Sequence, residues 1–446
     1  MLSKLKKIPS RKILKYILIS SFVLSIAYSF YFRINPVVDA NAYDRIAVNI
    51  VEGFGFIEDR TVSFEYDKSI VRAGPGYEYF LAGVYFIFGH NYEIVWFLQA
   101  VLHVLSAYII FLIAKQLFKD GGEKIGIVSA AIFAFSPDLV EISAMLMTET
   151  LYLFFTILIF YLFVRIYQDA GSKPLTVVTG ISMGAAILMR PPLLLFIPVF
   201  LVLYLYRKQY SLSMLFLGST GLIILPWVIR NYTIYDQFIL TTMIAEYNLW
   251  VGNTLLSEGG QIAGGFNVLE DYVSKNGFFG LKQKAQMEFF TFIFTHPFVF
   301  IKLTFIRFIR YFSLIRPMGF WFYQVGIGQM IMVTSSLLWI AFLFVTGFSG
   351  MVSLLLKKNK IFCYLTVLAL TSPLVLLPTV VQSRYRFQIY PFLCIFAGYF
   401  LVAFIKEKKW WKKKEFFIPT LFLVVVSLID VFFSLDKVLE RIGGLF

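Results

Sequence analysis

The chain of 446 residues is 59% hydrophobic and has a mean hydropathy of +0.77, a composition too apolar for an ordinary soluble fold. Its formal charge of +14 does not indicate nucleic-acid binding, because the basic residues form short runs beside apolar segments rather than a basic domain. The two cysteines, Cys363 and Cys394, lie in apolar stretches, which argues against a disulfide framework and against a cysteine-based metal site.

The N-terminal segment predicts a retained transmembrane helix. An apolar run at 13–32 is about as long as a bilayer-spanning helix, follows several basic residues and precedes no small-residue cleavage site. Residues 33–78 then carry eight carboxylates and are predicted to form a first large outer loop. Further apolar segments bring the prediction to about eleven transmembrane helices: 92–117, 125–145, 149–168, 174–189, 191–206, 211–229, 328–355, 361–381, 388–405 and 416–434.

A second large outer loop is predicted at 230–327. Residues 282–294 have a helix-like pattern, and 296–316 place Lys302, Arg307 and Arg310 among aromatic residues. This mixture suits a helix lying in the membrane interface better than one that spans it. The predicted fold is therefore a single all-α membrane domain, 1–446, with juxtamembrane helices in both large outer loops.

The charge pattern predicts which side each loop faces. With the N-terminus in the cytoplasm, alternation places a basic group in every inner loop, including Lys119, Lys173, Arg207 and the cytoplasmic loop 406–415. The same alternation places most carboxylates outside. We therefore predict a multi-pass protein of the plasma or inner membrane with its polar site on the outer face.

Asp39 is the first candidate for chemistry. It follows the first span, and a carboxylate at that level could act as general base toward an acceptor hydroxyl. An Asp ahead of a helical pattern is also a common helix cap, and sequence alone leaves both interpretations open. Similarly, Arg72 precedes a Gly/Pro turn and could bind a phosphate or could snorkel as an interfacial anchor. Glu149 opens an apolar helix, where the helix dipole favours it in any case.

Four further arginines are predicted at the same outer interface. One interfacial arginine carries little information, but several from separate spans favour an anionic lipid headgroup. These residues are Arg190, Arg230, Arg384 and Arg386. No phosphate-binding loop, dinucleotide fingerprint or nucleophile elbow is present, which leaves cytoplasmic nucleotide chemistry without support.

Taken in order, these motifs resemble those of the GT-C superfamily of polytopic membrane glycosyltransferases. Within it, the chain is similar to the protein O-mannosyltransferases and to the aminoarabinose transferases that act on lipid A. The motifs are Asp39-x-x-x-Tyr43, Gly53-Phe-Gly55, Arg72-x-x-Pro75-x-Tyr77, Ser136-Pro137, Met147-Thr-Glu149-Thr, Leu188-Met-Arg190-Pro191, Pro226-Trp227-x-x-Arg230, Asn248-Leu-Trp250-x-Gly252-Asn253 and Arg384-Tyr385-Arg386.

The resemblance implies an inverting transferase that takes a sugar from a polyprenyl-phosphate donor, with Asp39 as catalytic base. It implies donor-phosphate contacts by Arg72, Arg190, Arg384 and Arg386. Substrate contacts are implied for Tyr43, Tyr77, Glu149, Trp250, Asn253 and Tyr385. The acceptor would be a hydroxyl of a protein, a lipid or a surface glycan, and the sequence selects none of these.

Two departures from the family pattern bear on a metal. Many members carry an acidic pair at the catalytic position, whereas Ala40 follows Asp39. Some relatives bind a metal through a Glu and a His near the site, whereas here Val71 precedes Arg72. His90, His103 and His296 share no metal-ligand spacing. We therefore predict no cofactor and no metal. The alternatives left open are a transporter or flippase for lipid-linked glycans and an outer-leaflet polysaccharide ligase or polymerase.

Overall fold

The computed structural model describes residues 10–169, 171–260, 265–316, 326–404 and 410–443, and no β-strand occurs among them. The basic residues Lys4, Lys6 and Lys7, part of the predicted loop 406–415 and the end of the predicted outer loop lie outside these ranges. The predicted all-α membrane architecture is confirmed.

Seven described helices are long and apolar enough to cross a bilayer. They are α2 (Ser10–Phe32), α5 (Tyr92–Leu117), α8 (Glu149–Gln168), α11 (Tyr210–Tyr235), α16 (Ile327–Leu356), η3 with α18 (Ser383–Ile389 and Tyr390–Phe404) and α19 (Lys414–Gly443). Three shorter apolar segments are α9 (Lys173–Met189), η2 with α10 (Pro191–Leu195 and Phe196–Tyr206) and α17 (Lys360–Leu376).

Two helix pairs are bent. Helices α6 (Gly122–Ala134) and α7 (Pro137–Ser143) meet at 58°, and α14 (Leu281–Thr295) and α15 (Pro297–Phe312) meet at 106°. Counting each pair as one span raises the number of crossings among the described residues to nine. Each of the eleven predicted segments coincides with a helix or a bent pair, but the predicted count of eleven crossings is not confirmed.

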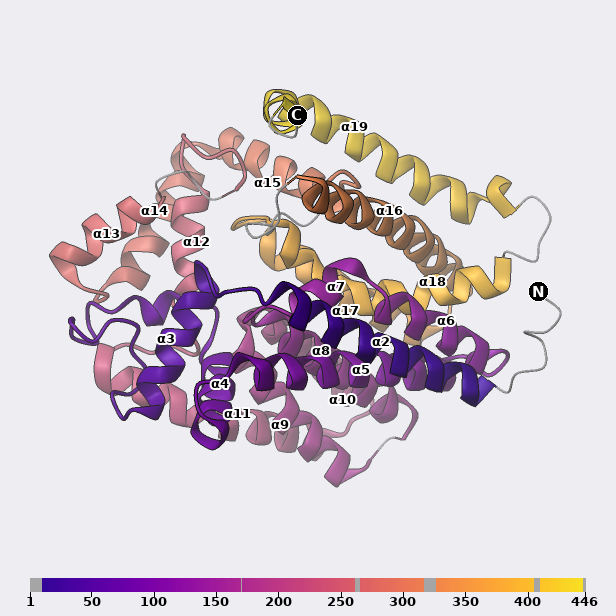
Figure 1. Ribbon diagram of the computed structural model, residues 1–446, viewed down its shortest axis with the longest axis horizontal. Helices are drawn as coiled ribbons and strands as arrows, with labels where there is room; N and C mark the ends of the chain where they lie inside the picture. The colour runs from indigo at the N-terminus through magenta and orange to yellow at the C-terminus, as the bar shows by residue number, and fades with distance from the viewer. Residues whose placement is uncertain (1–9, 170, 261–264, 317–325, 405–409, 444–446) are drawn as a thin grey trace.

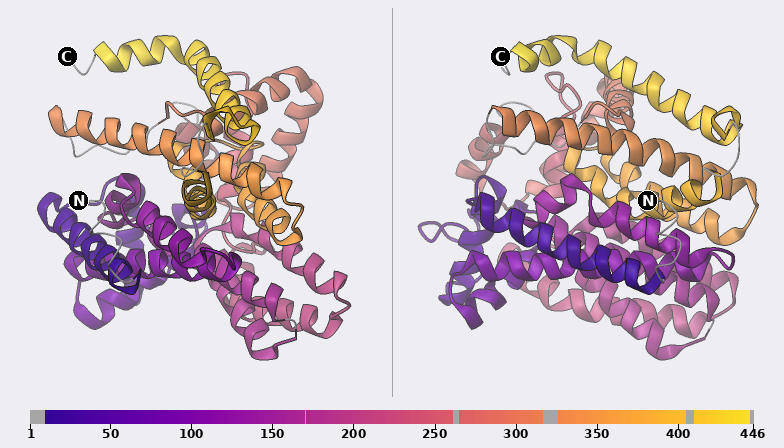
Figure 2. Two further views of the ribbon diagram at one scale, coloured as in Figure 1. Left: turned by 90° about the vertical axis from the view of Figure 1, so that its right-hand side faces the viewer. Right: turned by 45° about the vertical axis from the view of Figure 1, so that its right-hand side comes forward.

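The remaining helices belong to the two polar stretches: α3 (Asp39–Val51), η1 (Lys68–Val71), α4 (Pro75–Phe88), α12 (Ile244–Gly252) and α13 (Gly265–Asn276), with a short η4 (Trp410–Lys412) before α19. Figure 1 shows α3, α12, α13 and α14 together at one end of the bundle, while α2 begins toward the other end. The turned views of Figure 2 show the long helices running side by side.

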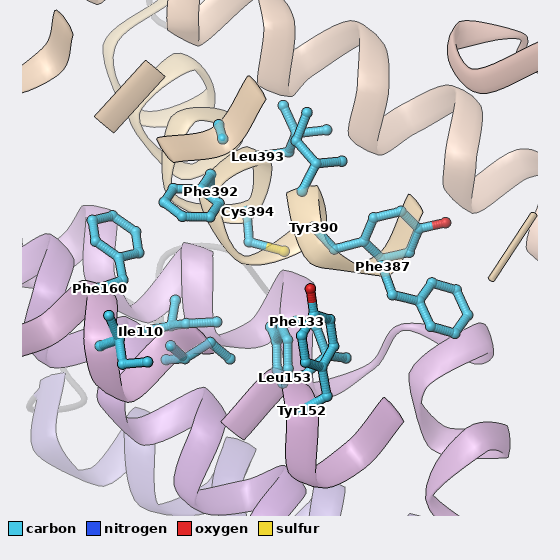
Figure 3. Packing of buried hydrophobic residues seen from close by; sticks show 14 of the residues in the cluster. Ile110, Phe133, Tyr152, Leu153, Phe160, Phe387, Tyr390, Phe392, Leu393 and Cys394 are labelled. Atoms are coloured by element: carbon cyan, nitrogen blue, oxygen red, sulfur yellow. The ribbon is translucent and has the colours of Figure 1, made fainter. Parts of the chain in front are cut away.

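The bundle core is built around α18, whose spanning window is 83% buried. Phe392 of α18 stacks on Phe160 of α8 with ring centroids 4.5 Å apart, and Cys394 faces the same packed interior (Figure 3). Glycines allow the closest helix approaches: a Cβ at Gly350 of α16 would lie 2.0 Å from the Phe396 carbonyl of α18. This small-residue packing is typical of membrane helices and fixes the position of η3 at the end of α18.

The two polar stretches share a second, smaller core. Ile70 and Val71 of the first stretch pack with residues of α11 to α14, and the Met243 amide donates to the Ile70 carbonyl at 2.8 Å. Gly277 has φ +62°, and a Cβ there would lie 2.9 Å from the Glu65 carbonyl, so a side chain is excluded at this crossing. The two polar stretches therefore form one packed loop unit at the end of the bundle.

Candidate active site

A cavity of about 540 Å³ lies between this loop unit and the ends of α8, α9 and α17. Its lining comes from α3, η1 and the segment after it, α12, α13 and η3 as well. Part of its lining, the apolar wall, consists of hydrophobic side chains, and another part, the charged wall, carries ionisable side chains. The apolar wall includes Pro191, Pro192, Leu194, Leu195, Ile244, Val375, Leu376 and Val380. A volume of this size with few polar groups is typical of a small-molecule site.

Asp39 is the first residue of α3 and lies on the charged wall. Its carboxylate accepts a hydrogen bond from Arg384 at 2.7 Å, and a second guanidinium, that of Arg72, lies 3.6 Å away. Burial raises the pKa of Asp39, but these guanidinium groups outweigh burial and the net pKa is lowered. The carboxylate is directed toward arginines in the cavity, and the preceding Val38, a β-branched residue at φ +51°, makes no side-chain cap.

Arg72 has a stronger partner than Asp39. Its Nε and Nη2 atoms donate to the two carboxylate oxygens of Glu58, each at 2.8 Å, and this paired geometry fixes the guanidinium plane. Glu58 also accepts from Arg45 at 2.5 Å, and the Asp67 carboxylate holds the Glu58 amide at 2.9 Å. The first polar stretch therefore contains both Arg72 and the counter-ion of Arg72, Glu58.

On the other side of Asp39, Glu149 is fully buried at the start of α8. It accepts from Arg190 at 2.5 Å, and Arg384 lies 3.9 Å away. The ring of Tyr385 lies beneath both guanidinium groups, at 5.9 Å from Arg190 and 5.5 Å from Arg384.

Together the six groups form one row of alternating charge: Glu58, Arg72, Asp39, Arg384, Glu149 and Arg190. Tyr43 lies beside this row and lines the cavity. The structure thus brings together Asp39, Tyr43, Arg72, Glu149, Arg190, Arg384 and Tyr385, seven of the residues that the motifs predicted.

Four of the predicted site residues do not line the cavity. The Tyr77 hydroxyl donates to Gln99 at 3.0 Å behind Tyr43, and Trp250 packs edge-on against Tyr272. The Asn253 amide donates to the Pro378 carbonyl at 2.8 Å. Arg386 is 1% exposed, and its guanidinium donates to the Ser313 carbonyl at 2.7 Å and to the Arg316 carbonyl. Its predicted contact with donor phosphate therefore finds no support in the geometry, because backbone carbonyls occupy its donors.

The structure also shows functional neighbours that the motifs did not indicate. Glu58 is one, and Arg307 of α15 is another. Arg307 is fully buried and donates to Asn253, to the Gly252 carbonyl and to the Leu377 carbonyl. It thereby ties the end of α12 to the chain that follows α17, which explains why the Gly252-Asn253 motif exists although it does not reach the cavity.

A metal-binding group is not found among the residues that the structure describes, in which no three His, Cys, Asp or Glu side chains cluster as ligands. The three site carboxylates each pair with an arginine instead.

Glu78, one turn into α4, is fully buried, and neither carboxylate oxygen pairs with another described residue. Burial raises its pKa from 4.5 to about 8. The folded protein thus keeps this proton up to about pH 8, whereas the unfolded chain releases it near pH 4.5, so folding stability should fall as pH rises between these values. Glu78→Gln removes the titration and is expected to raise the thermal midpoint over wild type by an amount that grows from pH 5 to pH 8. Melting both proteins in detergent across this range measures it, and a difference independent of pH would contradict the assignment.

Comparison with known proteins agrees with this architecture. Residues 72–231 match the family model of dolichyl-phosphate-mannose-protein mannosyltransferases. The oligosaccharyltransferase AglB of Archaeoglobus fulgidus, solved with an inhibitory peptide and a dolichol-phosphate, aligns at 15% identity over 94% of this chain and 55% of that chain, with a TM-score of 0.53. ArnT of Cupriavidus metallidurans, solved with undecaprenyl phosphate, aligns at 12% identity over 96% of this chain and 72% of that chain, with a TM-score of 0.51.

The chain therefore has the fold of the GT-C membrane glycosyltransferases, and the resemblance predicted from its motifs is confirmed. It spans about half the length of the oligosaccharyltransferases that it matches. No curated protein sequence matches it. These similarities define the fold, and the activity and its substrates are argued below from the chemistry of the cavity.

Proposed function

We propose that the protein is an inverting glycosyltransferase that moves a sugar from a polyprenyl-phosphate donor to an acceptor hydroxyl at the outer face of the membrane. The observation that carries this proposal is the cavity itself, in which an ionised aspartate and three arginines line the same space as many apolar side chains. A polyprenyl-phosphate sugar suits this lining, because its anionic phosphate can pair with the arginines and its isoprenoid tail can contact the apolar side chains. AglB and ArnT were solved with dolichol-phosphate and undecaprenyl phosphate, which supports a lipid phosphate as the donor's carrier.

The proposed reaction is a single displacement. The acceptor hydroxyl oxygen forms a bond to the anomeric carbon while the bond from that carbon to the phosphate oxygen breaks. The hydroxyl proton passes to the carboxylate of Asp39, and the electron pair of the broken bond stays on the lipid phosphate, which gains one negative charge. Attack and departure on opposite faces of the sugar invert the anomeric centre. No cofactor is needed to balance the step.

The arginines would do two things in this reaction. Arg384 and Arg72 lower the basicity of Asp39. A donor phosphate that recruits these guanidinium groups frees Asp39 to accept a proton, so the base becomes effective when the donor is in place. During transfer the same groups stabilise the charge that develops on the departing phosphate.

We place the cavity at the outer face because the sequence puts basic loops at the opposite ends of the spans. Lys357 and Lys360 flank the turn between α16 and α17, and Lys173 opens α9, whose C-terminal end reaches the cavity through Arg190. Positive residues are retained on the cytoplasmic side.

Sugar transfer by the purified protein tests the proposal. The assay combines liposomes that hold a radiolabelled polyprenyl-phosphate sugar with membranes from a strain lacking the gene, which supply the acceptor. Radiolabelled sugar should appear on the acceptor only when the purified protein is present in the liposomes. Mass spectrometry of surface glycans and glycoproteins with and without the gene then identifies the sugar and the acceptor. Movement of intact donor across the bilayer without any labelled product would instead favour the transporter alternative.

A further inference from the structure

Of the three carboxylates in the row of alternating charge, Glu58 is the one that does not line the cavity. Its side chain is only 6% exposed, although it carries a charge and comes from a loop without helix or strand. Burying a carboxylate is costly unless it is fully paired, so its position requires a reason. It accepts both donors of the Arg72 fork, and Asp67 fixes its backbone through the Glu58 and Asp59 amides.

The distances show that Glu58 and Asp39 are competing partners for the Arg72 guanidinium. Arg72 lies 3.6 Å from the Asp39 carboxylate and 2.8 Å from each oxygen of Glu58. A guanidinium presents several donors, and the one aimed at Asp39, Nη1, is not used by Glu58. Without the Glu58 charge, Arg72 could close on Asp39 or on any anion in the cavity.

We propose that Glu58 is a positioning residue that holds Arg72 back from Asp39, so that the arginine neither binds the donor phosphate too tightly nor quenches the base. This inference rests on the proposed function. It predicts opposite effects on binding and on turnover, since a freed Arg72 attracts phosphate more strongly while it stabilises ionised Asp39 and weakens it as a proton acceptor. A residue with a purely structural role would impair both.

The test uses Glu58→Gln in the full chain in nanodiscs, with undecaprenyl phosphate as the binding probe. We expect the variant to bind this lipid roughly three- to tenfold more tightly, because a nearby negative charge that repels the lipid phosphate is lost. We expect kcat for sugar transfer to fall, KM for the donor to fall with it, and the acid limb of the pH profile to move to lower pH. Glu58→Asp keeps the charge and should restore wild-type values.

Glu52→Gln is the matched control. Glu52 lies in the same loop and pairs with an arginine, Arg60, but both side chains are exposed and neither reaches the cavity. Its removal makes the same change in charge and should leave lipid binding and the pH profile unchanged. A second measurement uses the Arg72→Gln background, in which Glu58→Gln should have no further effect because the two act through one contact.

The outcomes are distinguishable. Weaker or unchanged lipid binding by Glu58→Gln, or a full effect of that change in the Arg72→Gln background, overturns the positioning role and leaves the proposed function standing. Failure of the wild-type protein to bind undecaprenyl phosphate or to transfer sugar from a polyprenyl-phosphate donor overturns the proposed function itself.

Discussion

Replacement of Asp39 by asparagine is expected to reduce sugar transfer by about 10²- to 10⁴-fold, the range that a positioned general base contributes. Asparagine keeps the size of the side chain but cannot accept the acceptor's proton. Because the carboxylate lies in the cavity wall and is 21% exposed, we expect the fold to tolerate this change. Binding of undecaprenyl phosphate should persist, since Arg384 and Arg72 lose a competing anion.

The control for this change is Asp59→Asn. Asp59 lies in the same polar stretch and binds only Thr61 through its side chain, at 2.7 Å and 2.9 Å, so its neutralisation should leave transfer intact. Transfer rates of both variants, measured after matched insertion and yield, decide the point. Activity of Asp39→Asn near that of wild type would remove Asp39 from the role of base.

The sequence could predict those site residues that belong to recognisable motifs. Composition and apolar runs predicted a helical membrane protein, because the bilayer imposes long apolar helices on any chain that crosses it. Ordered motifs around those runs predicted that Asp39, Arg72, Glu149 and Arg384 act together, and the structure places them in one cavity. Neither kind of pattern gives distances.

Some residues of the motifs do not line the cavity, and local backbone geometry explains why. Arg384 and Arg386 are two residues apart, yet η3 directs the first toward Asp39 and the second toward the carbonyls of Ser313 and Arg316. Their identical chemistry hides this difference in a sequence. Gly252 is a packing residue, since a Cβ there would lie 2.4 Å from the Thr379 carbonyl. Such contacts join segments 70 or more residues apart and leave no periodic signal.

Glu58 illustrates a second reason why the sequence could not predict the whole site. It shares no spacing or motif with Arg72, and its loop has neither helix nor strand to predict a direction for its side chain. Its role becomes visible only when the Asp67 carboxylate is seen to organise the turn around it. Counter-ions of functional arginines are therefore a class of residue for which a structure adds what motifs omit.

Arg384→Gln is expected to lower kcat by about 10²- to 10³-fold, the cost of losing one preorganised donor to a developing oxyanion. It should also change the pH profile in a defined direction. In the wild-type protein the pKa of Asp39 is lowered, so the base stays ionised, and transfer persists, until pH falls below the ordinary range of an aspartate. Arg384 is the largest of the influences that lower the pKa of this carboxylate, so its removal should raise the pKa of Asp39 relative to wild type and move the acid limb of kcat/KM to higher pH.

The shift for Arg384→Gln is thus opposite in sign to the one expected for Glu58→Gln, and this contrast separates an electrostatic account of the site from general damage to it. Both variants would lower turnover, but damage moves the two acid limbs together or not at all. Arg33→Gln, which breaks an exposed pair with Glu93 away from the cavity, supplies the baseline. Rate profiles recorded between pH 3.5 and pH 8 for the three variants would test the row of alternating charge directly, and acid limbs that coincide for Arg384→Gln and Glu58→Gln would show that these residues do not act through Asp39.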